Sequence, residues 1–226
     1  MKKYYFVGMS ERKQFRTVLE FYDSIAPDYD SHMTESDKKA RLSVRDLFRK
    51  YVTAGNILDF GGGTGLDLPW MVESGYNVLF MEPSEKMRAI AHQRIQSNNV
   101  TFINDWGDTR LFQQKVNGIF ANFAVFNCIE NDFDVLFQTF ARISSDNCYV
   151  VATVIDPRFG NMIKHYSIVA ATKMLLRSRL TIQSDRHPTY IHSISSLRKA
   201  SGEYFALQSI VALDVSSFAV LIFKKK

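Results

Sequence analysis

Cysteine is scarce in this chain of 226 residues, and long apolar runs are missing from it. The two cysteines, Cys128 and Cys148, lack the spacing of a metal site or a redox pair. We therefore interpret them as small buried residues of a reduced, cytoplasmic protein, and we expect no bound metal. No apolar stretch is long enough to span a bilayer. The apolar residues near the N-terminus are too few for a signal peptide, because charged residues follow at 11–13.

Internal repeats and low-complexity segments are also lacking, which excludes a repeat architecture and a largely disordered chain. The net charge of +5 forms no basic stripe, because much of it lies in Lys2, Lys3 and residues 224–226. Charge at the chain ends is typical of solvated termini rather than of a nucleic-acid surface. What remains is an ordinary globular composition, 46% hydrophobic and 23% charged, with enough Phe and Tyr for a large core and an aromatic-lined pocket.

The most informative stretch is Ile57–Gly65, where the apolar run Ile-Leu-Asp-Phe breaks into Gly-Gly-Gly-Thr-Gly. The apolar run predicts a buried strand. The glycines predict a turn at which a ligand approaches the backbone, because a residue without Cβ can take positive φ. An acidic residue, Glu82, follows the next apolar run, Tyr76–Met81. A carboxylate at that place in an open α/β sheet accepts hydrogen bonds from ribose hydroxyls, so the pattern predicts a nucleoside-containing ligand.

Strand-like and helical segments alternate through the middle of the chain. We expect strands at 56–60, 76–81, 100–104, 118–122 and 148–155, and helices at 66–74, 84–97 and 132–143. Gly75 is expected to end the first of these helices and Ser84 to cap the second. The alternation predicts an α/β fold with a mostly parallel sheet and helices on both faces. Two apolar runs, 204–213 and 217–224, are too close together for a crossover helix, so they predict an antiparallel C-terminal hairpin.

We expect one domain over residues 1–226 with two helical additions. The first is an N-terminal helical cap at about 10–52, in which Phe15, Val18, Leu19 and Tyr22 recur at helical spacing before a turn at 27–30. The second is a mostly helical, lid-like insert at about 156–190. It follows the end of a strand, where substrate-binding elements occur.

Four short motifs occupy matching places after successive strands. They are Asp59-Phe60-Gly61-Gly62-Gly63-Thr64-Gly65, Glu82-Pro83-Ser84 with Met87, Asn104-Asp105-Trp106, and Ala121-Asn122-Phe123-Ala124. Together with the closing hairpin, these motifs resemble those of the class I S-adenosylmethionine-dependent methyltransferases of the small-molecule type. The resemblance covers about residues 15–226. It implies a Rossmann-like, seven-stranded, mostly parallel sheet and S-adenosylmethionine as the cofactor.

The resemblance also implies a set of cofactor-binding residues. They are Tyr29, Asp59, Gly61, Gly63, Gly65, Glu82, Pro83, Met87, Asp105, Trp106, Asn122 and Ala124. Asp59 would orient the ammonium group of the cofactor, and Glu82 would accept both ribose hydroxyls. Asp105 and Trp106 would contact the adenine, with Asp108 as a competing position. The backbone carbonyls of Asn122 and Ala124 would face the sulfonium.

The acceptor side is less defined. Phe126, Asn127 and Tyr22 are the expected substrate contacts, and Tyr22 and Tyr29 are expected to close over the cofactor from the N-terminal cap. His165, Tyr166 and His192, with His187, are the candidate acid–base groups. Ordinary roles are open for each of them: core packing for the aromatic residues and a structural hydrogen bond for each histidine. Because no residue stands out as a general base, alignment of the two reactants is expected to supply much of the rate.

The expected activity is transfer of a methyl group from S-adenosylmethionine to an O, N or C atom of a small, apolar or aromatic molecule. An RNA or other nucleic-acid methyltransferase is an alternative that the isoelectric point of 9.1 suggests. Asn122 is followed by Phe-Ala-Val, however, instead of the Pro-Pro-aromatic sequence usual for base amino groups. A nucleotide-sugar or NAD-dependent oxidoreductase shares the glycine turn, but Asp59 and the hairpin argue against it. A non-catalytic Rossmann-like binding protein also stays open.

The expected partner is a small-molecule acceptor, with the protein a monomer or a homodimer. The segment Met162–Leu180 is apolar and carries Lys164, Lys173, Arg177 and Arg179. Contact with a membrane surface is therefore an alternative to a plain lid for this segment.

Overall fold

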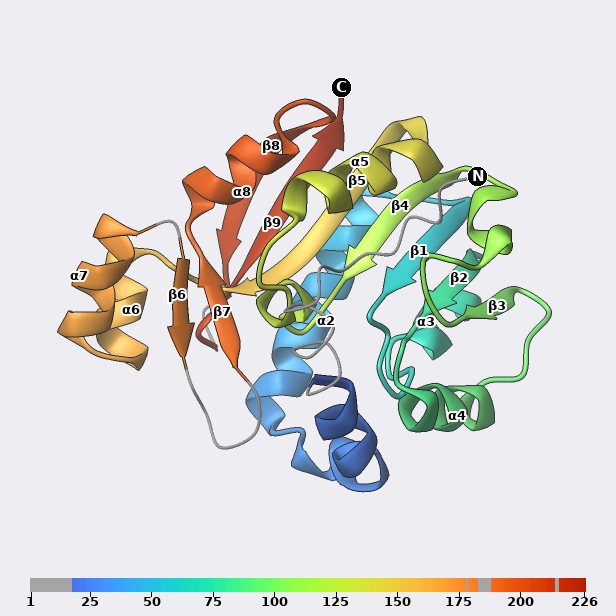
Figure 1. Cartoon of the computed structure of the whole chain (residues 1–226). Coiled ribbons are helices and arrows are strands. Elements are labelled where there is room, and N and C mark those ends of the chain that lie inside the picture. The colour runs from blue at the N-terminus through green and yellow to red at the C-terminus, as the bar shows by residue number, and fades with distance from the viewer. Residues whose placement is uncertain (1–17, 178, 183–187, 214–215) are drawn as a thin grey trace.

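A seven-stranded sheet forms the centre of the molecule. The computed structural model describes residues 18–226 apart from 178, 183–187 and 214–215, and the strand order is β3-β2-β1-β4-β5-β9-β8 (Figure 1). The parallel strands are β1 (Asn56–Phe60), β2 (Asn77–Met81), β3 (Val100–Ile103), β4 (Val116–Ala121) and β5 (Ser144–Ile155). β9 (Phe218–Lys225) runs antiparallel between β5 and β8 (Phe205–Ala212). The predicted fold class and the C-terminal hairpin are confirmed.

Helices cover both faces of this sheet. α2 (Glu35–Tyr51), α3 (Leu68–Glu73) and α4 (Glu85–Arg94) pack on one face, and α5 (Phe133–Ile143) and α8 (Ile194–Ser201) pack on the other (Figure 1). The strand residues divide between the two faces with the period of two that a pleated strand imposes: Ile57 joins the α2 side, and Leu58 and Phe60 join the α5 side. Because both faces are buried, the central parts of the strands are mostly apolar, which makes them recognisable in the sequence.

Local signals set the ends of the helices near the glycine loop. Ser84 caps α4, since its Oγ accepts a hydrogen bond from the backbone N–H of Met87 at 3.2 Å. Gly75 follows α3 with a φ of +79°. Both predictions are confirmed, although α3 is shorter than the predicted 66–74 and α4 ends at Arg94 instead of Ser97.

The N-terminal cap consists of a helix at residues 18–25, the 3-10 helix η1 (Ala26–His32) and α2. Residues 10–17 of the predicted cap, with Phe15, lie outside the described residues. The turn predicted at 27–30 is the middle of η1, which Pro27 can enter because its missing N–H falls in the first turn. Thr34 then starts α2 with a capping box that involves Asp37.

Among the described residues, the insert predicted as helical at 156–190 is helical in its first part only. α6 (Phe159–His165) and α7 (Ile168–Leu176) are followed by two short antiparallel strands, β6 (Arg179–Ile182) and β7 (Thr189–His192). Both strands contain β-branched residues, but each is only four residues long, which is too short for a clear strand pattern in the sequence. The insert lies at the end of the molecule opposite β3 and α4 (Figure 1). None of the helices described here is long and apolar enough to cross a membrane.

Candidate functional site

The glycine loop after β1 leaves part of its backbone open to a ligand. Gly61, Gly63 and Gly65 have φ values of +72°, +61° and +74°. The N–H groups of Gly61 and Gly62 both donate to the carbonyl of Met81 at the end of β2, at 2.8 and 3.2 Å. A Cβ on Gly61 would lie 2.2 Å from Cγ2 of Val125, whereas a Cβ on Gly63 would meet no described atom within 4 Å. The loop is thus fixed at its start and accessible at Gly63.

Glu82 holds the end of β2 against this loop. The residue is 7% exposed, and its carboxylate accepts from the N–H of Gly63 at Oε2 and from the N–H of Ser84 at Oε1, both at 2.8 Å. Burial raises the pKa of Glu82 to about 7, although the two backbone donors act in the opposite direction. Each carboxylate oxygen has a second lone pair, so the group can accept further hydroxyl donors without losing these contacts.

Asp59 is a buried carboxylate with an unused acceptor. It is 2% exposed, and its Oδ2 has no hydrogen-bond partner among the described residues. Burial, with the nearby Asp67 carboxylate as a smaller cause, raises the pKa of Asp59 well above its usual value. An unpaired buried carboxylate is costly, and a cation placed beside it would offset that cost.

A second cluster of polar side chains lies between the cap and the sheet, and it includes Arg41 and Asp67, which the sequence did not predict as site residues. Arg41 of α2 forms an ion pair with Asp67, which also accepts from Nδ2 of Asn122 at 3.2 Å. Nε of Arg41 is buried without a hydrogen-bond partner in the described part of the chain. The Arg41 guanidinium lies 4.3 Å from the ring centre of Phe123. The site therefore holds an unpaired buried donor as well as an unpaired buried acceptor.

The loop that follows β4 has an unusual backbone conformation. Phe123 and Ala124 have φ values of 53° and 63°, which residues other than glycine rarely adopt. Oδ1 of Asn122 accepts from the N–H of Phe123 and from Oγ1 of Thr153, both at 2.8 Å, and the carbonyl of Ala124 accepts from the N–H of Asn127. Strained backbone of this kind is concentrated at functional sites.

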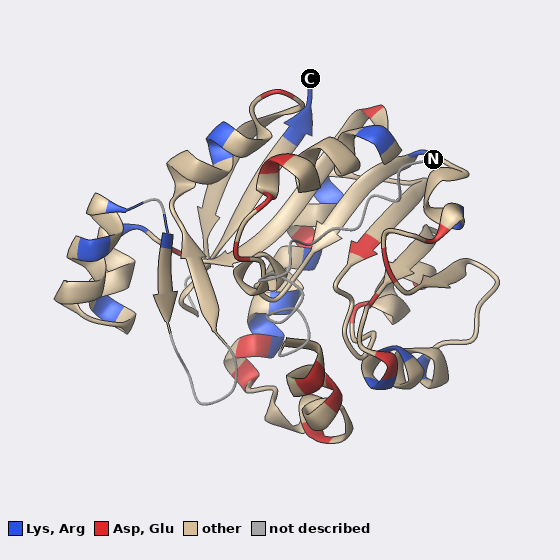
Figure 2. Cartoon of the chain, viewed as in Figure 1, with Lys and Arg blue, Asp and Glu red and all other residues tan. Residues whose placement is uncertain are grey.

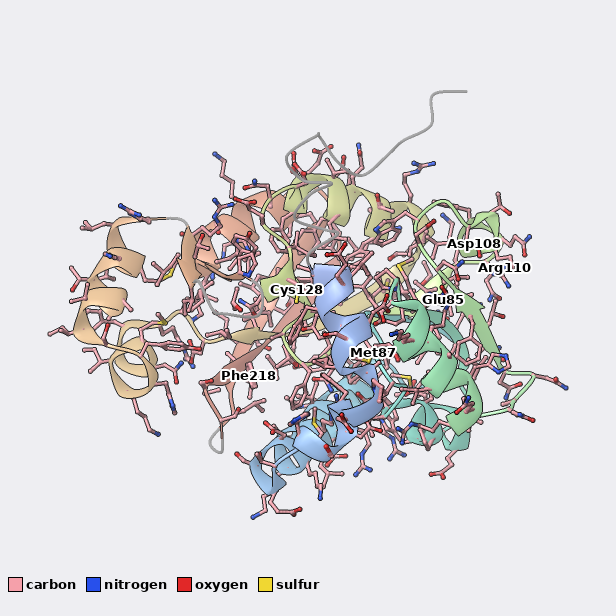
Figure 3. All side chains as sticks on the ribbon, turned by 60° about the horizontal axis from the view of Figure 1, so that its bottom comes forward. Glu85, Met87, Asp108, Arg110, Cys128 and Phe218 are labelled. Atoms are coloured by element: carbon pink, nitrogen blue, oxygen red, sulfur yellow. The ribbon has the colours of Figure 1, made fainter. Side chains whose placement is uncertain are left out.

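The N-terminal cap is fastened over the glycine loop. The Asp23 carboxylate accepts from Oγ of Ser84 at 2.5 Å, and the Asp30 carboxylate accepts from Oγ1 of Thr64 at 2.5 Å and pairs with Arg94. In Figure 3 the helix at 18–25 passes between Cys128 and Met87, in agreement with these contacts.

Two aromatic side chains of the cap face the site. The hydroxyl of Tyr22 lies 3.6 Å from Sγ of Cys128, and the ring of Tyr22 meets that of Tyr29 edge-on at 6.4 Å. Burial raises the pKa of both tyrosines, so their hydroxyls stay protonated at neutral pH. Burial also raises the pKa of the Cys128 thiol to about 11, so this cysteine is not a thiolate.

The residues predicted for the adenine are held by local contacts. Asp105 is exposed, and its Oδ1 accepts from the N–H of Gly107 at 2.6 Å. Trp106 packs beside Phe60, with ring centres 5.4 Å apart. Asp108 caps the 3-10 helix η2 (Thr109–Phe112) and pairs with Arg110, which holds the pKa of its carboxyl below the usual value (Figure 3). The carboxylate of Asp108 is therefore engaged by Arg110.

A family model described as a methyltransferase domain matches residues 29–204. The chain belongs to this methyltransferase family. Among solved structures, a complex of DhpI with S-adenosylhomocysteine aligns over 94% of this chain and 97% of the other, with 15% identity and a TM-score of 0.67. The Burkholderia thailandensis 1,6-didemethyltoxoflavin-N1-methyltransferase, solved with 1,6-didemethyltoxoflavin and S-adenosylhomocysteine, aligns over 94% and 89%, with 12% identity and a TM-score of 0.65.

A third similar structure is a complex between the Haloferax volcanii Trm112 methyltransferase activator and a methyltransferase. It aligns over 90% of this chain and 96% of the other, with 13% identity and a TM-score of 0.65. At these identities the likeness shows the fold. No curated protein sequence matches the chain. The family model over residues 29–204 confirms the predicted methyltransferase family.

Three of the residues predicted for the acceptor side connect elements of the methyltransferase to one another. Phe126, in the 3-10 helix η3 (Val125–Cys128), is fully buried against aromatic rings of α5. Asn127 donates to the carbonyl of Tyr190 at 2.6 Å and accepts from the N–H of Ile155 at 2.9 Å. Nε2 of His192 lies 2.8 Å from the carbonyl of Ile129, and burial lowers the pKa of His192 to about 4. These contacts hold η3 against the insert.

The remaining acid–base candidates lie away from the glycine loop. His165 and Tyr166 are exposed at the end of α6, at the opposite end of the molecule from α3 and α4 (Figure 1). His187 lies outside the described residues. The structure thus brings Asp59, Glu82, the glycines and the two tyrosines of the cap together, and leaves His165 and Tyr166 apart. No group of His, Cys, Asp and Glu that could hold a metal ion occurs in the described ranges.

Proposed function

We propose that this methyltransferase binds S-adenosylmethionine between the glycine loop and the N-terminal cap, and transfers the methyl group to a small apolar or aromatic molecule. The observation that carries the proposal is the buried Oδ2 of Asp59, which has no partner in the described structure and lies at the end of the strand that leads into the glycine loop. A cationic group of the ligand would supply the missing partner.

The residues present fit the parts of this cofactor. Asp59 would accept from the ammonium group, and Glu82 would accept from the two ribose hydroxyls with its free lone pairs. Arg41, whose Nε is buried without a described partner, would donate to the carboxylate of the methionine moiety. When bound, the cofactor supplies a methyl group on a positively charged sulfur.

The protein's own contribution is orientation and exclusion of water. The hydrogen bonds of Asp23 and Asp30 hold the cap against α4 and the glycine loop, which keeps Tyr22 and Tyr29 over the site. The neutral tyrosine hydroxyls can donate to an acceptor molecule but cannot serve as strong bases. Alignment of the two reactants at contact distance can supply a large part of the rate in such a site.

Charge and shape near the cap favour a small acceptor over a nucleic acid. The first part of the cap, residues 18–37, contains no Lys or Arg and carries six acidic residues, namely Glu20, Asp23, Asp28, Asp30, Glu35 and Asp37 (Figure 2). An acidic rim repels a polyanionic backbone, because nucleic-acid affinity depends on cations that replace counterions. The rings of Tyr22, Tyr29 and Phe123 near the site suit an aromatic acceptor. The Burkholderia relative, which is named for methylation of an N atom of 1,6-didemethyltoxoflavin, supports the same class.

A transfer assay tests the proposal. The protein is incubated with S-adenosylmethionine labelled on its methyl group and a panel of hydroxylated and nitrogen-containing aromatic molecules, and in parallel with RNA. We expect label in one or more small molecules and none in RNA. Labelled RNA without a labelled small molecule would contradict the acceptor class. Cofactor binding without transfer to any acceptor would favour a non-catalytic binding protein.

A further inference from the structure

The outer surface of the insert is unusually apolar. Seven of the ten large apolar side chains that are exposed in the described residues lie between Phe159 and Leu176. Among them, Ile168, Leu175 and Leu176 are 65%, 69% and 81% exposed. Single exposed apolar residues are normal on a protein surface, whereas a group of this size on two adjacent helices marks an interaction site.

α7 is apolar on two sides, and the fold buries one of them. Ala171 and Met174 pack inward with Ile155, Met162 and Ile191. On the outer side, a shallow groove is lined by Ile168, Val169, Thr172, Lys173 and Leu176. A surface helix of a globular protein normally turns polar residues to the solvent, so a helix that is apolar on both sides favours a second apolar environment.

The charge around this outer surface has one sign. The sequence from Pro157 to Ser184 contains no Asp or Glu. Lys164, Lys173 and Arg177 form no ion pair within the part of the chain that the structure describes, while Arg158 and Arg179 are paired with Asp156 and Glu130. Figure 2 shows basic and no acidic residues on α6 and α7. The apolar surface is thus bordered by unpaired cations.

We propose that the outer face of α6 and α7 docks onto the surface of an anionic lipid bilayer. Apolar side chains that enter the interface, bordered by Lys and Arg, are the combination that binds such surfaces. The alkyl stems of the lysines can lie along the acyl region while their ammonium groups reach the lipid phosphates. A second copy of the chain fits less well, because a two-fold contact through this face would bring the unpaired cations of both copies together.

The docking surface and the cofactor site are separate. α6 and α7 lie at the other end of the molecule from α3 and α4, which flank the glycine loop (Figure 1). Membrane docking goes beyond the proposed transfer reaction and does not depend on it. Binding of S-adenosylhomocysteine therefore serves as an independent check that the variants used below are folded.

Co-sedimentation with vesicles tests the docking surface. The full chain is mixed with vesicles of phosphatidylcholine alone or of phosphatidylcholine with phosphatidylglycerol. We expect sedimentation with the anionic vesicles and little with the neutral ones. Since each cation near an anionic surface contributes about fivefold to partitioning, the pair Lys164→Gln and Lys173→Gln should lower it by about 25-fold. The pair Val169→Ser and Leu176→Ser should lower it by about tenfold or more.

Matched controls use exposed residues elsewhere. Lys39→Gln with Lys50→Gln removes the same charge from α2, and Val135→Ser removes an exposed apolar side chain from α5. Both should change partitioning by less than about twofold. Absence of sedimentation with anionic vesicles would overturn the proposal, and so would equal binding to neutral vesicles. A dimer in sedimentation velocity that Val169→Ser and Leu176→Ser dissociate would assign the face to a second copy and would also overturn it.

Discussion

Different interactions hold the elements in place at the glycine-loop end of the molecule and at the insert end. At the loop end, carboxylates make specific hydrogen bonds: Glu82 to Gly63 and Ser84, Asp23 to Ser84, and Asp30 to Thr64. At the insert end, a small apolar cluster around Met162 and Met174 holds α6 and α7, and much of their outer surface is apolar and exposed. The difference indicates a directional polar ligand at one end and an apolar surface contact at the other.

The loop end also buries two carboxylates whose negative charge carries an electrostatic cost. Asp59 and Glu82 are nearly fully buried, and burial raises the pKa of both. Natural proteins keep such destabilising groups where function needs them. Changes at the loop end should therefore alter cofactor affinity, and matched changes at the insert end should not.

The largest effect is expected from Glu82→Ala. Hydrogen bonds to a charged group contribute about 1.5–3 kcal/mol each, so loss of two ribose contacts should weaken S-adenosylhomocysteine binding by about 100-fold or more. Isothermal titration calorimetry measures this change. Leu176→Ser at the insert end is the matched control, and its affinity should equal that of the wild type. An unchanged affinity in Glu82→Ala would remove Glu82 from the ribose site.

The two ends should respond to pH in opposite directions. His192 has a folded-state pKa lowered to about 4 from 6.5, so its stabilising contribution is present above pH 6.5 and is lost as the pH falls through 4. Glu82 has a folded-state pKa raised to about 7 from 4.5, so its contribution is present below pH 4.5 and is lost as the pH rises through 7. Each contribution is about 3 kcal/mol, with 1.36 kcal/mol per pKa unit.

Denaturant unfolding between pH 4 and 8 separates these two contributions. Relative to His192→Gln, the ligand-free wild type should gain stability as the pH rises over this range. Relative to Glu82→Gln, it should lose stability over the same range. Parallel curves for the wild type and either variant would show that folding does not shift the pKa of the substituted residue.

Asp59→Asn should separate stability from binding. The substitution removes a buried, unpaired charge, so the ligand-free protein should be more stable by about 1–2 kcal/mol at neutral pH. Binding of S-adenosylhomocysteine should weaken by about tenfold or more, because a charge-assisted contact to the ammonium is lost. Thermal unfolding and calorimetry on the same sample measure both. A variant that is less stable than the wild type and binds S-adenosylhomocysteine with the same affinity would contradict the assigned role.

The smallest effects are expected at two glycines that have positive φ and free space beside them. Gly63 and Gly75 have φ values of +61° and +79°, and a Cβ on either would meet no described atom within 4 Å. Gly63→Ala and Gly75→Ala should each cost about 1 kcal/mol of stability, because Ala disfavours positive φ. Only Gly63→Ala should also weaken cofactor binding, since its methyl group would enter the space in front of the loop. Equal affinities would show that the cofactor does not approach Gly63.

The sequence predicted the features that depend on local chemistry. The glycine loop needs positive φ at three positions, Ser84 caps its helix within one turn, and the strands are apolar because helices cover both faces of the sheet. The hairpin was visible because two apolar runs are too close for a crossover. By contrast, β6 and β7 are four residues each, which is too short for a clear pattern within a helical segment.

The site residues that were missed come together only through tertiary packing. Asp23 and Asp30 reach α4 and the glycine loop from the cap, and Arg41 reaches Asp67 from α2. No spacing in the sequence connects these pairs. Phe126 and Asn127 were predicted as substrate contacts because they follow β4, but η3 turns them into the core and toward β7, where their partners lie.

A crystal structure of the protein with S-adenosylhomocysteine tests the central claim most directly. We expect the ammonium group within hydrogen-bond distance, about 2.7–3.2 Å, of Oδ2 of Asp59, and the ribose hydroxyls at the same distance from the Glu82 carboxylate. A ligand bound elsewhere, or one whose amino-acid tail leaves Asp59 without a partner, would contradict the account.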